Sequence, residues 1–229
     1  MDKIHNYTLI RSRRKSLALH ITKDAVLEAR APLKMPKAEI DRFVLSKARW
    51  IQSHIDRLAA RADARTCFAL DYGSNVVIQG ADCPIIAGKG RTVSFDGINV
   101  TMPPNLDSAQ IKRAVVRLYK LIAKNILNER VGIYSKKMGV APSGVKITGA
   151  MRRWGSCSSK NSLNFTWRLA MADLRVVDYV VVHELAHIIE RNHSPRFWAV
   201  VEKYLPDYKE RRKIQKQLYD RLASEDWNT

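Results

Sequence analysis

The sequence predicts an α+β fold, in which long helices alternate with groups of short β-strands. Apolar residues recur at the helical period over residues 36–65 and again from about 107 to 133, whereas the segments between them alternate short apolar runs with turn residues. The chain has 229 residues, of which 46% are hydrophobic, enough to bury a core. We expect one compact unit with two subdomains, a β-rich one at 1–105 with one long helix and a second at 106–229.

The N-terminal segment is predicted to form a small antiparallel sheet followed by a helix. Apolar runs at 7–10, 16–21 and 26–29 are strand-like, and the last two are separated by a turn at 22–24. One long helix is expected from Pro36 to about Arg65. Its apolar face would consist of Ile40, Phe43, Val44, Ile51, Ile55 and Leu58.

The middle of the chain is predicted to form a β-meander that precedes a second long helix. Apolar runs at 75–78, 83–87, 92–95 and 98–102 are separated by glycine-bearing turns, and Pro103-Pro104 ends the series. Asp107 or Ser108 is the expected N-cap of the helix. Its predicted apolar stripe is Ile111, Val115, Leu118, Ile122, Ile126 and Ile133.

The C-terminal part combines two strands with further helices. Residues 145–150 and 162–169 are strand-like, with a turn expected at 155–161, and a final helix is predicted from Pro206 to about Ala223. The run at 176–182 is rich in β-branched residues and thus open to two interpretations. It precedes a histidine motif and is expected to be helical, although a buried strand is the alternative.

The charge balance favours a polyanionic partner, and the lack of a long apolar run argues against a membrane protein. The chain carries 40 basic and 22 acidic residues, a net charge of +18, with the excess in residues 1–65 and 106–229. We therefore expect nucleic-acid contact as one possible role, with Arg211, Arg212 and Lys213 as candidate contacts. No apolar run is long enough to span a bilayer, and the three cysteines have no paired spacing, which predicts a cytoplasmic protein.

The sequence HELAH at 183–187 indicates a metal site. Residues four apart on a helix lie on one face, so His183 and His187 can direct both imidazoles to one zinc ion, with Glu184 beside the open coordination position. On a strand the two imidazoles would be about 13 Å apart and would not share an ion. The spacing therefore predicts a zinc hydrolase motif on a helix.

A third ligand is expected after a break in this helix. His193 would point away from the metal on a continuous helix, but Asn192 tolerates a left-handed conformation, and Ser194-Pro195 resembles the start of a new helix. His193 would then return to the ion and leave the fourth position to water. Glu202, on the following helix, stays open as the alternative third ligand.

Several stretches resemble the YgjP-like metallopeptidase family, which is related to SprT- and Spartan-type zinc proteases. They are Met151–Ser158, Asn164, the HELAH segment, Asn192–Ser194 and Phe197-Trp198, together with N-terminal segments such as Arg13-Arg14-Lys15 and Ala29–Pro32. The resemblance implies a zincin-like core, in which an active-site helix packs against a small sheet. It also implies His183, His187 and His193 as zinc ligands and Glu184 as catalytic base. Metzincin proteases differ, because Glu190 stands where they have glycine.

The resemblance implies that the substrate is a protein or peptide. Some relatives cut proteins that are crosslinked to DNA, and a substrate of this kind would be consistent with the basic charge of the chain. Candidate substrate-binding residues are Arg152, Arg153 and Trp154, and candidate oxyanion stabilisers are Arg152, Arg153 and Tyr179. Asp178 and Glu190 are candidates for orienting a ligand imidazole. Trp154 and Cys157 are alternatively expected to pack against the active-site helix.

Two other functions stay open from the residues alone. Arg152, Arg153 and the basic flanks suit a metal-dependent hydrolase of nucleotides or other phosphorylated substrates. A nucleic-acid-binding protein with structural zinc is the second alternative, although structural zinc usually has four protein ligands. The sequence does not indicate an oligomeric state.

Overall fold

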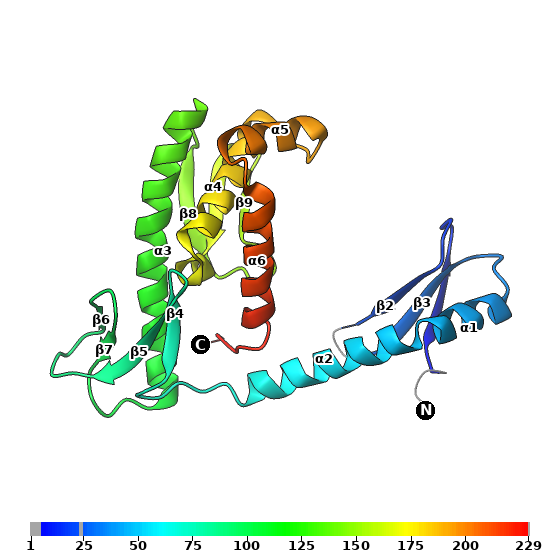
Figure 1. Ribbon diagram of the computed structural model, residues 1–229, viewed down its shortest axis with the longest axis horizontal. Coiled ribbons are helices and arrows are strands. Elements are labelled where there is room, and N and C mark those ends of the chain that lie inside the picture. Colours follow the sequence, from blue (N-terminus) through cyan, green and yellow to red (C-terminus); the bar gives the residue numbers. More distant parts are fainter. Residues whose placement is uncertain (1–5, 23–24, 229) are drawn as a thin grey trace. The chain divides into compact units, whose positions relative to one another are not determined.

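The computed structural model describes residues 6–22 and 25–228 and confirms the predicted α+β class, with six α-helices and three small sheets in the described part (Figure 1). The chain divides into two compact units, one formed by the residues up to 68 with 223–226 and the other by 69–222 with the chain end. This division after residue 68 differs from the boundary that we predicted between residues 105 and 106. The two subdomains on either side of that boundary stay a prediction. No helix of the described residues is both long and apolar enough to cross a membrane.

The first unit holds a mixed sheet rather than the predicted antiparallel one. Its strands are β1 (Thr8–Ser12), β2 (Ala18–Ile21) and β3 (Leu27–Pro32), in the order β1-β3-β2. β2 and β3 are antiparallel as expected, but β1 pairs in parallel with the far edge of β3. Residues 23 and 24 of the predicted turn lie outside the described residues.

The predicted single helix of the first unit is divided into α1 (Lys37–Ser46) and α2 (Ala48–Thr66). The break lies at Lys47, whose N–H donates to the carbonyl of Val44, three residues back, so that the helix tightens and restarts. The apolar face continues across the break, because Ile40, Val44 and Ile51 all join the buried core formed with β2 and β3.

The second unit begins with a four-stranded sheet that is not the predicted meander. Its strands are β4 (Asn75–Ile78), β5 (Ala81–Ala87), β6 (Ser94–Phe95) and β7 (Val100–Met102). The order is β4-β5-β7-β6, and β5 pairs in parallel with β7. The strand positions agree with the apolar runs, but the pairing between non-consecutive strands does not follow from them.

The long helix α3 (Ser108–Met138) begins at the predicted cap. The Asp107 side chain accepts from the Gln110 N–H and the Gln110 side chain accepts from the Asp107 N–H, a complete capping box, and Gly139 ends the helix in a left-handed conformation. The predicted stripe holds only as far as Leu118, since Ile122, Ile126 and Ile133 are only half-buried. Beyond it the buried face consists of Tyr119, Ala123, Leu127, Val131, Tyr134 and Met138.

A second sheet and three helices complete this unit. The sheet has the order β8-β10-β9 and consists of β8 (Gly144–Thr148), β10 (Ser162–Thr166) and β9 (Gly155–Cys157), which lies where a turn was predicted. The predicted strand 162–169 is too long, because a 3-10 helix replaces it at Trp167–Met171. Helices α4 (Leu174–Ile189), α5 (Pro195–Tyr204) and α6 (Tyr208–Leu222) follow, and α4 contacts α3, α5, α6 and β9 (Figure 1).

A buried carboxylate ties three of these helices together. Asp178 of α4 accepts two hydrogen bonds from Arg130 of α3, at 2.5 and 2.9 Å, and a third from the Tyr134 hydroxyl at 3.1 Å. Arg211 of α6 lies 3.7 Å from the same carboxylate. The position of α4, which carries the histidine motif, therefore depends on this ionic network.

We expect Asp178→Asn to lower the free energy of unfolding by about 3–5 kcal/mol, because it leaves the Arg130 guanidinium largely buried without a counter-charge. Urea unfolding followed by circular dichroism measures the change. Glu210→Gln is the matched control: Glu210 forms an exposed pair with Lys213, and its loss should cost less than about 1 kcal/mol. Equal effects of the two substitutions would contradict a structural role for the network.

Candidate active site

The histidine motif lies on α4, and the β-branched run before it is helical. Asp173 caps the helix by accepting from the Arg175 N–H, and residues 176–182 are buried throughout. Burial of this apolar segment between α3 and α6 outweighs its preference for a strand. His183, Glu184 and His187 consequently occupy neighbouring positions on one helix.

His193 reaches the motif because the chain turns after α4, though not where the sequence predicted. Helix α4 ends at Ile189, and Glu190 is extended (φ −130°, ψ 111°). Asn192 is absent from the residues of positive φ in the described chain, so the left-handed conformation expected there is wrong. The restart is as predicted, since the Ser194 side chain caps α5 and Pro195 is its first residue.

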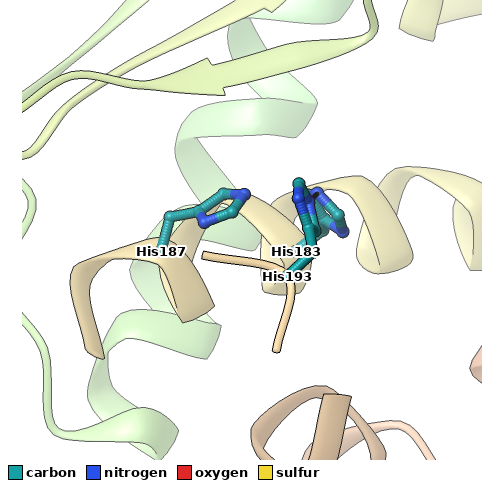
Figure 2. Close-up of side chains that lie close together, drawn as sticks. All are labelled: His183, His187 and His193. Atoms are coloured by element: carbon teal, nitrogen blue, oxygen red, sulfur yellow. Dashed lines mark hydrogen bonds between the residues drawn. The ribbon is translucent and has the colours of Figure 1, made fainter. Parts of the chain in front are cut away.

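The three imidazoles converge from α4 and the segment before α5 (Figure 2). One nitrogen of each ring lies within 4.8 Å of the others, and the Nε2 atoms of His183 and His193 are 3.0 Å apart. Tetrahedral zinc with bonds of about 2.0–2.1 Å separates its ligand nitrogens by about 3.3–3.4 Å. The cluster is therefore close to the size that such an ion requires.

Hydrogen bonding and burial favour the protonation state that a metal needs. Nδ1 of His187 lies 3.2 Å from the carbonyl of Glu190, so a proton on Nδ1 leaves the Nε2 lone pair for a metal. Burial and the neighbouring imidazoles lower the pKa of His183 to about 3, and burial also lowers the pKa of His187. Neutral imidazoles are the form that ligates metal ions.

Phe197 packs against all three imidazoles of the cluster. Its ring is fully buried, and its centroid lies 4.9, 4.5 and 4.7 Å from those of His183, His187 and His193. Trp198 packs against His193 at 5.8 Å and stacks on Tyr208 of α6. These contacts restrict the orientations of the three imidazoles. The sequence marks Phe197 and Trp198 only through the resemblance and predicts no role for them.

Glu184 is buried beside β9. It is 5% exposed, and burial raises its pKa to about 8, an effect that the positive charge of Arg153 partly opposes. A Cβ atom on Gly155 would lie 2.6 Å from Glu184 Oε1, closer than atoms approach without displacement. Gly155 thus makes room for the carboxylate. Because the sequence predicted a turn at this position, the glycine did not signal a close approach within a strand.

We expect Gly155→Ala to lower by about 10²-fold any reaction in which the Glu184 carboxylate takes part, because misplacing a reacting group by about 1 Å costs this much. The φ angle of Gly155 is not positive, so the backbone accepts alanine and the effect acts through the displacement of Glu184. Gly144→Ala in β8 is the matched control, because its Cβ would meet no atom within 4 Å. If kcat is unchanged in Gly155→Ala while the control is also active, the close approach to Glu184 has no catalytic importance.

Arg191 joins the loop that carries His193 to the turn after β9. Its guanidinium donates to the carbonyls of Ser158 and Ser159 at 2.9 and 3.3 Å and to Asn161 Oδ1 at 2.5 Å. It also lies 3.8 Å from the Cys157 sulfur. The positions of His193 and of β9 are therefore coupled through one side chain, two residues before the histidine.

The residues predicted to bind substrate or to stabilise the oxyanion differ in their exposure. Arg152 and Arg153 are exposed before β9, while Trp154 is half-buried and its carbonyl accepts from the Thr166 N–H. Tyr179 is buried, with its ring 5.8 Å from that of His183, and burial raises its pKa to about 12.

Two expectations about the surroundings of the ligands are wrong. Asp178 does not orient an imidazole, because its oxygens are bound by Arg130 and Tyr134. Glu190 contacts His187 through its main-chain carbonyl rather than its carboxylate. Glu202 is exposed, 3.9 Å from the Lys209 ammonium, and is not part of the cluster formed by the three histidines.

Three converging imidazoles beside a buried carboxylate, on a helix packed against a small sheet, place the chain among the zincin-like metallohydrolases. A family model described as YgjP-like, metallopeptidase domain, matches residues 15–218. The chain belongs to this family. No curated protein and no solved structure matched it.

Proposed function

We propose that the protein is a zinc-dependent peptidase, with His183, His187 and His193 as ligands and Glu184 as the catalytic base. The observation that carries the proposal is the convergence of three imidazole nitrogens within 4.8 Å, next to a carboxylate that is 5% exposed. Three protein ligands are typical of catalytic zinc, because they leave a position for water or substrate, whereas structural zinc has four.

Bound zinc would polarise the substrate carbonyl and make water more acidic. Glu184 takes one proton from the attacking water on a carboxylate oxygen, as the new bond between the water oxygen and the carbonyl carbon forms. It then donates this proton to the amide nitrogen as the C–N bond breaks, so that acid and amine are released. Burial raises the pKa of Glu184 to about 8, and the positive charge of a bound zinc ion would lower it toward neutral pH, where a carboxyl group can both accept and donate a proton.

The outer edge of β9 is the proposed binding site for an extended peptide. In the part of the chain that the structure describes, β9 pairs with β10 alone, through Ser156 opposite Asn164 and through the carbonyl of Trp154. Antiparallel alternation then directs the main-chain groups of Gly155 and Cys157 away from β10. A peptide added there as a further strand would run beside Glu184, and Arg152, Arg153 and Trp154 lie at the start of this edge.

A narrower proposal is that the substrates are proteins associated with nucleic acid, which rests on the net charge of +18. The contacts expected on the last helix need revision. Arg211 is engaged by Asp207 and the main chain of Arg175, and Lys213 pairs with Glu210. Arg212 is exposed, with its guanidinium 5.1 Å from the Trp198 ring, and is the strongest remaining candidate of the three.

The experiment compares zinc-loaded, chelator-stripped and zinc-restored protein on a denatured cell lysate, with and without added DNA. New protein N-termini are counted by mass spectrometry. We expect new termini only with the zinc-loaded and zinc-restored protein, and more of them with DNA if nucleic acid recruits the substrate. Identical termini in all three preparations would contradict the proposed peptidase activity.

A further inference from the structure

A pocket of about 500 Å³ lies in the same unit as the histidine cluster, and none of its lining residues belongs to that cluster. It is formed by α3, the end of β8, the segment that follows β8, the 3-10 helix and the end of the chain. The residues that matter to its chemistry are Lys120, Lys124, Gly149, Trp167, Arg168 and Trp227.

The pocket contains a buried arginine that has no carboxylate partner among residues 6–22 and 25–228. Arg168 is 8% exposed, and burial lowers its pKa, with no acidic group opposing the shift. In the described chain its guanidinium makes one hydrogen bond, from Nη1 to the Gly149 carbonyl at 3.2 Å, and lies 4.4 Å above the Trp167 ring. One bond to a guanidinium with five N–H donors leaves most of its donor capacity unused.

This arrangement differs from the other largely buried arginines of the unit. Arg130 and Arg211 both pair with carboxylates, at 2.5 Å to Asp178 and at 2.8 Å to Asp207. Buried charges are normally paired, because an unpaired one is expensive to desolvate. Arg168, at a pocket wall and without a carboxylate partner among the described residues, therefore has donors available to an anion.

The rim and the wall of the pocket fit such an anion. Lys120 and Lys124 are exposed one turn apart on α3 and line the pocket together with Arg168, so that three positive charges border the same space. The Trp167 ring contacts the Arg168 guanidinium, Tyr119 stacks on it at 5.6 Å, and Trp227 packs edge-on at 6.2 Å. The guanidinium is thus held in place rather than free to swing toward solvent.

We propose that this pocket binds the terminal phosphate group of a small phosphorylated ligand, with Arg168 as its hydrogen-bonding fork and Lys120 and Lys124 as counter-charges. A phosphate monoester carries about −1.5 to −2 charges and three acceptor oxygens, which matches the three cations better than a carboxylate does. Because Arg168 is only 8% exposed, a group attached at one end reaches it more readily than a phosphodiester flanked on both sides. The proposal is independent of the peptidase activity.

The test is calorimetric titration of the zinc-loaded protein with inorganic phosphate and with a nucleoside monophosphate, at fixed ionic strength. We expect Arg168→Met to weaken binding by at least about tenfold, since a hydrogen bond to a charged group is lost. The exposed double variant Lys120→Ala/Lys124→Ala should weaken it several-fold without affecting the fold. His187→Ala is the control for phosphate at the zinc site, and it should retain binding.

Thermal unfolding separates a ligand site from a structural role of Arg168. Phosphate should raise the melting temperature of the wild type but not of Arg168→Met, and in phosphate-free buffer the variant should melt no lower than the wild type. Unchanged affinity in Arg168→Met, or destabilisation that phosphate does not influence, would overturn the proposal. Binding of a DNA duplex that depends on Arg168, without binding of either small phosphate, would overturn it in favour of a nucleic-acid backbone.

Discussion

Replacing Glu184 by Gln is expected to lower kcat/KM for peptide cleavage by about 10²–10⁴-fold, the range typical of a general acid-base group, while zinc stays bound. The amide has nearly the shape of the carboxylate and fits the space beside Gly155, but it does not accept the proton from water. The measurement is cleavage of a peptide identified in the lysate experiment, with the zinc content of each preparation determined by mass spectrometry.

Glu202→Gln is the matched control for this variant. Glu202 is an exposed carboxylate on α5 that lies 3.9 Å from Lys209, so its neutralisation should leave both zinc content and activity unchanged. Full activity of zinc-loaded Glu184→Gln would assign the base to another residue. Loss of zinc from this variant would instead mean that Glu184 acts on the metal site itself.

The features predicted correctly from the sequence are those that depend on neighbouring residues. The i, i+4 spacing of His183 and His187 and the Ser194-Pro195 restart of α5 are local, and so is the cap at Asp107. Each depends on a few consecutive residues whose side chains bond the adjacent backbone. The proposed site could be predicted from the sequence because two of its histidines lie on one helix.

The features that the sequence did not predict depend on contacts between distant segments. The parallel pairing of β5 with β7 and the position of β1 beside β3 join strands that are not consecutive. The close approach of Gly155 to Glu184 and the bonds of Arg191 to the turn after β9 likewise join segments about 30 residues apart. Hydrophobic periodicity contains no information about such pairings. It also predicted the wrong buried residues for the second half of α3, because the buried face of this helix rotates after Leu118.

Replacing His193 by Ala is expected to weaken zinc binding by more than about 100-fold. Loss of a residue that hydrogen-bonds to a metal ligand weakens binding by roughly 10–100-fold, and here a ligand itself is removed. His193 is exposed and lies outside the core, so the fold should persist and circular dichroism should be unchanged. Competition with a chromophoric zinc chelator measures the affinity.

Glu202→Ala separates the two candidates for the third ligand. The Nε2 atom of His193 is 3.0 Å from that of His183, whereas Glu202 interacts with Lys209, so we expect Glu202→Ala to bind zinc as the wild type does. The opposite result, loss of affinity in Glu202→Ala and not in His193→Ala, would require α5 to rotate its exposed face toward α4. Such a rotation would remove Phe197 from its contacts with all three imidazoles, and those contacts are the reason why His193 is the better candidate.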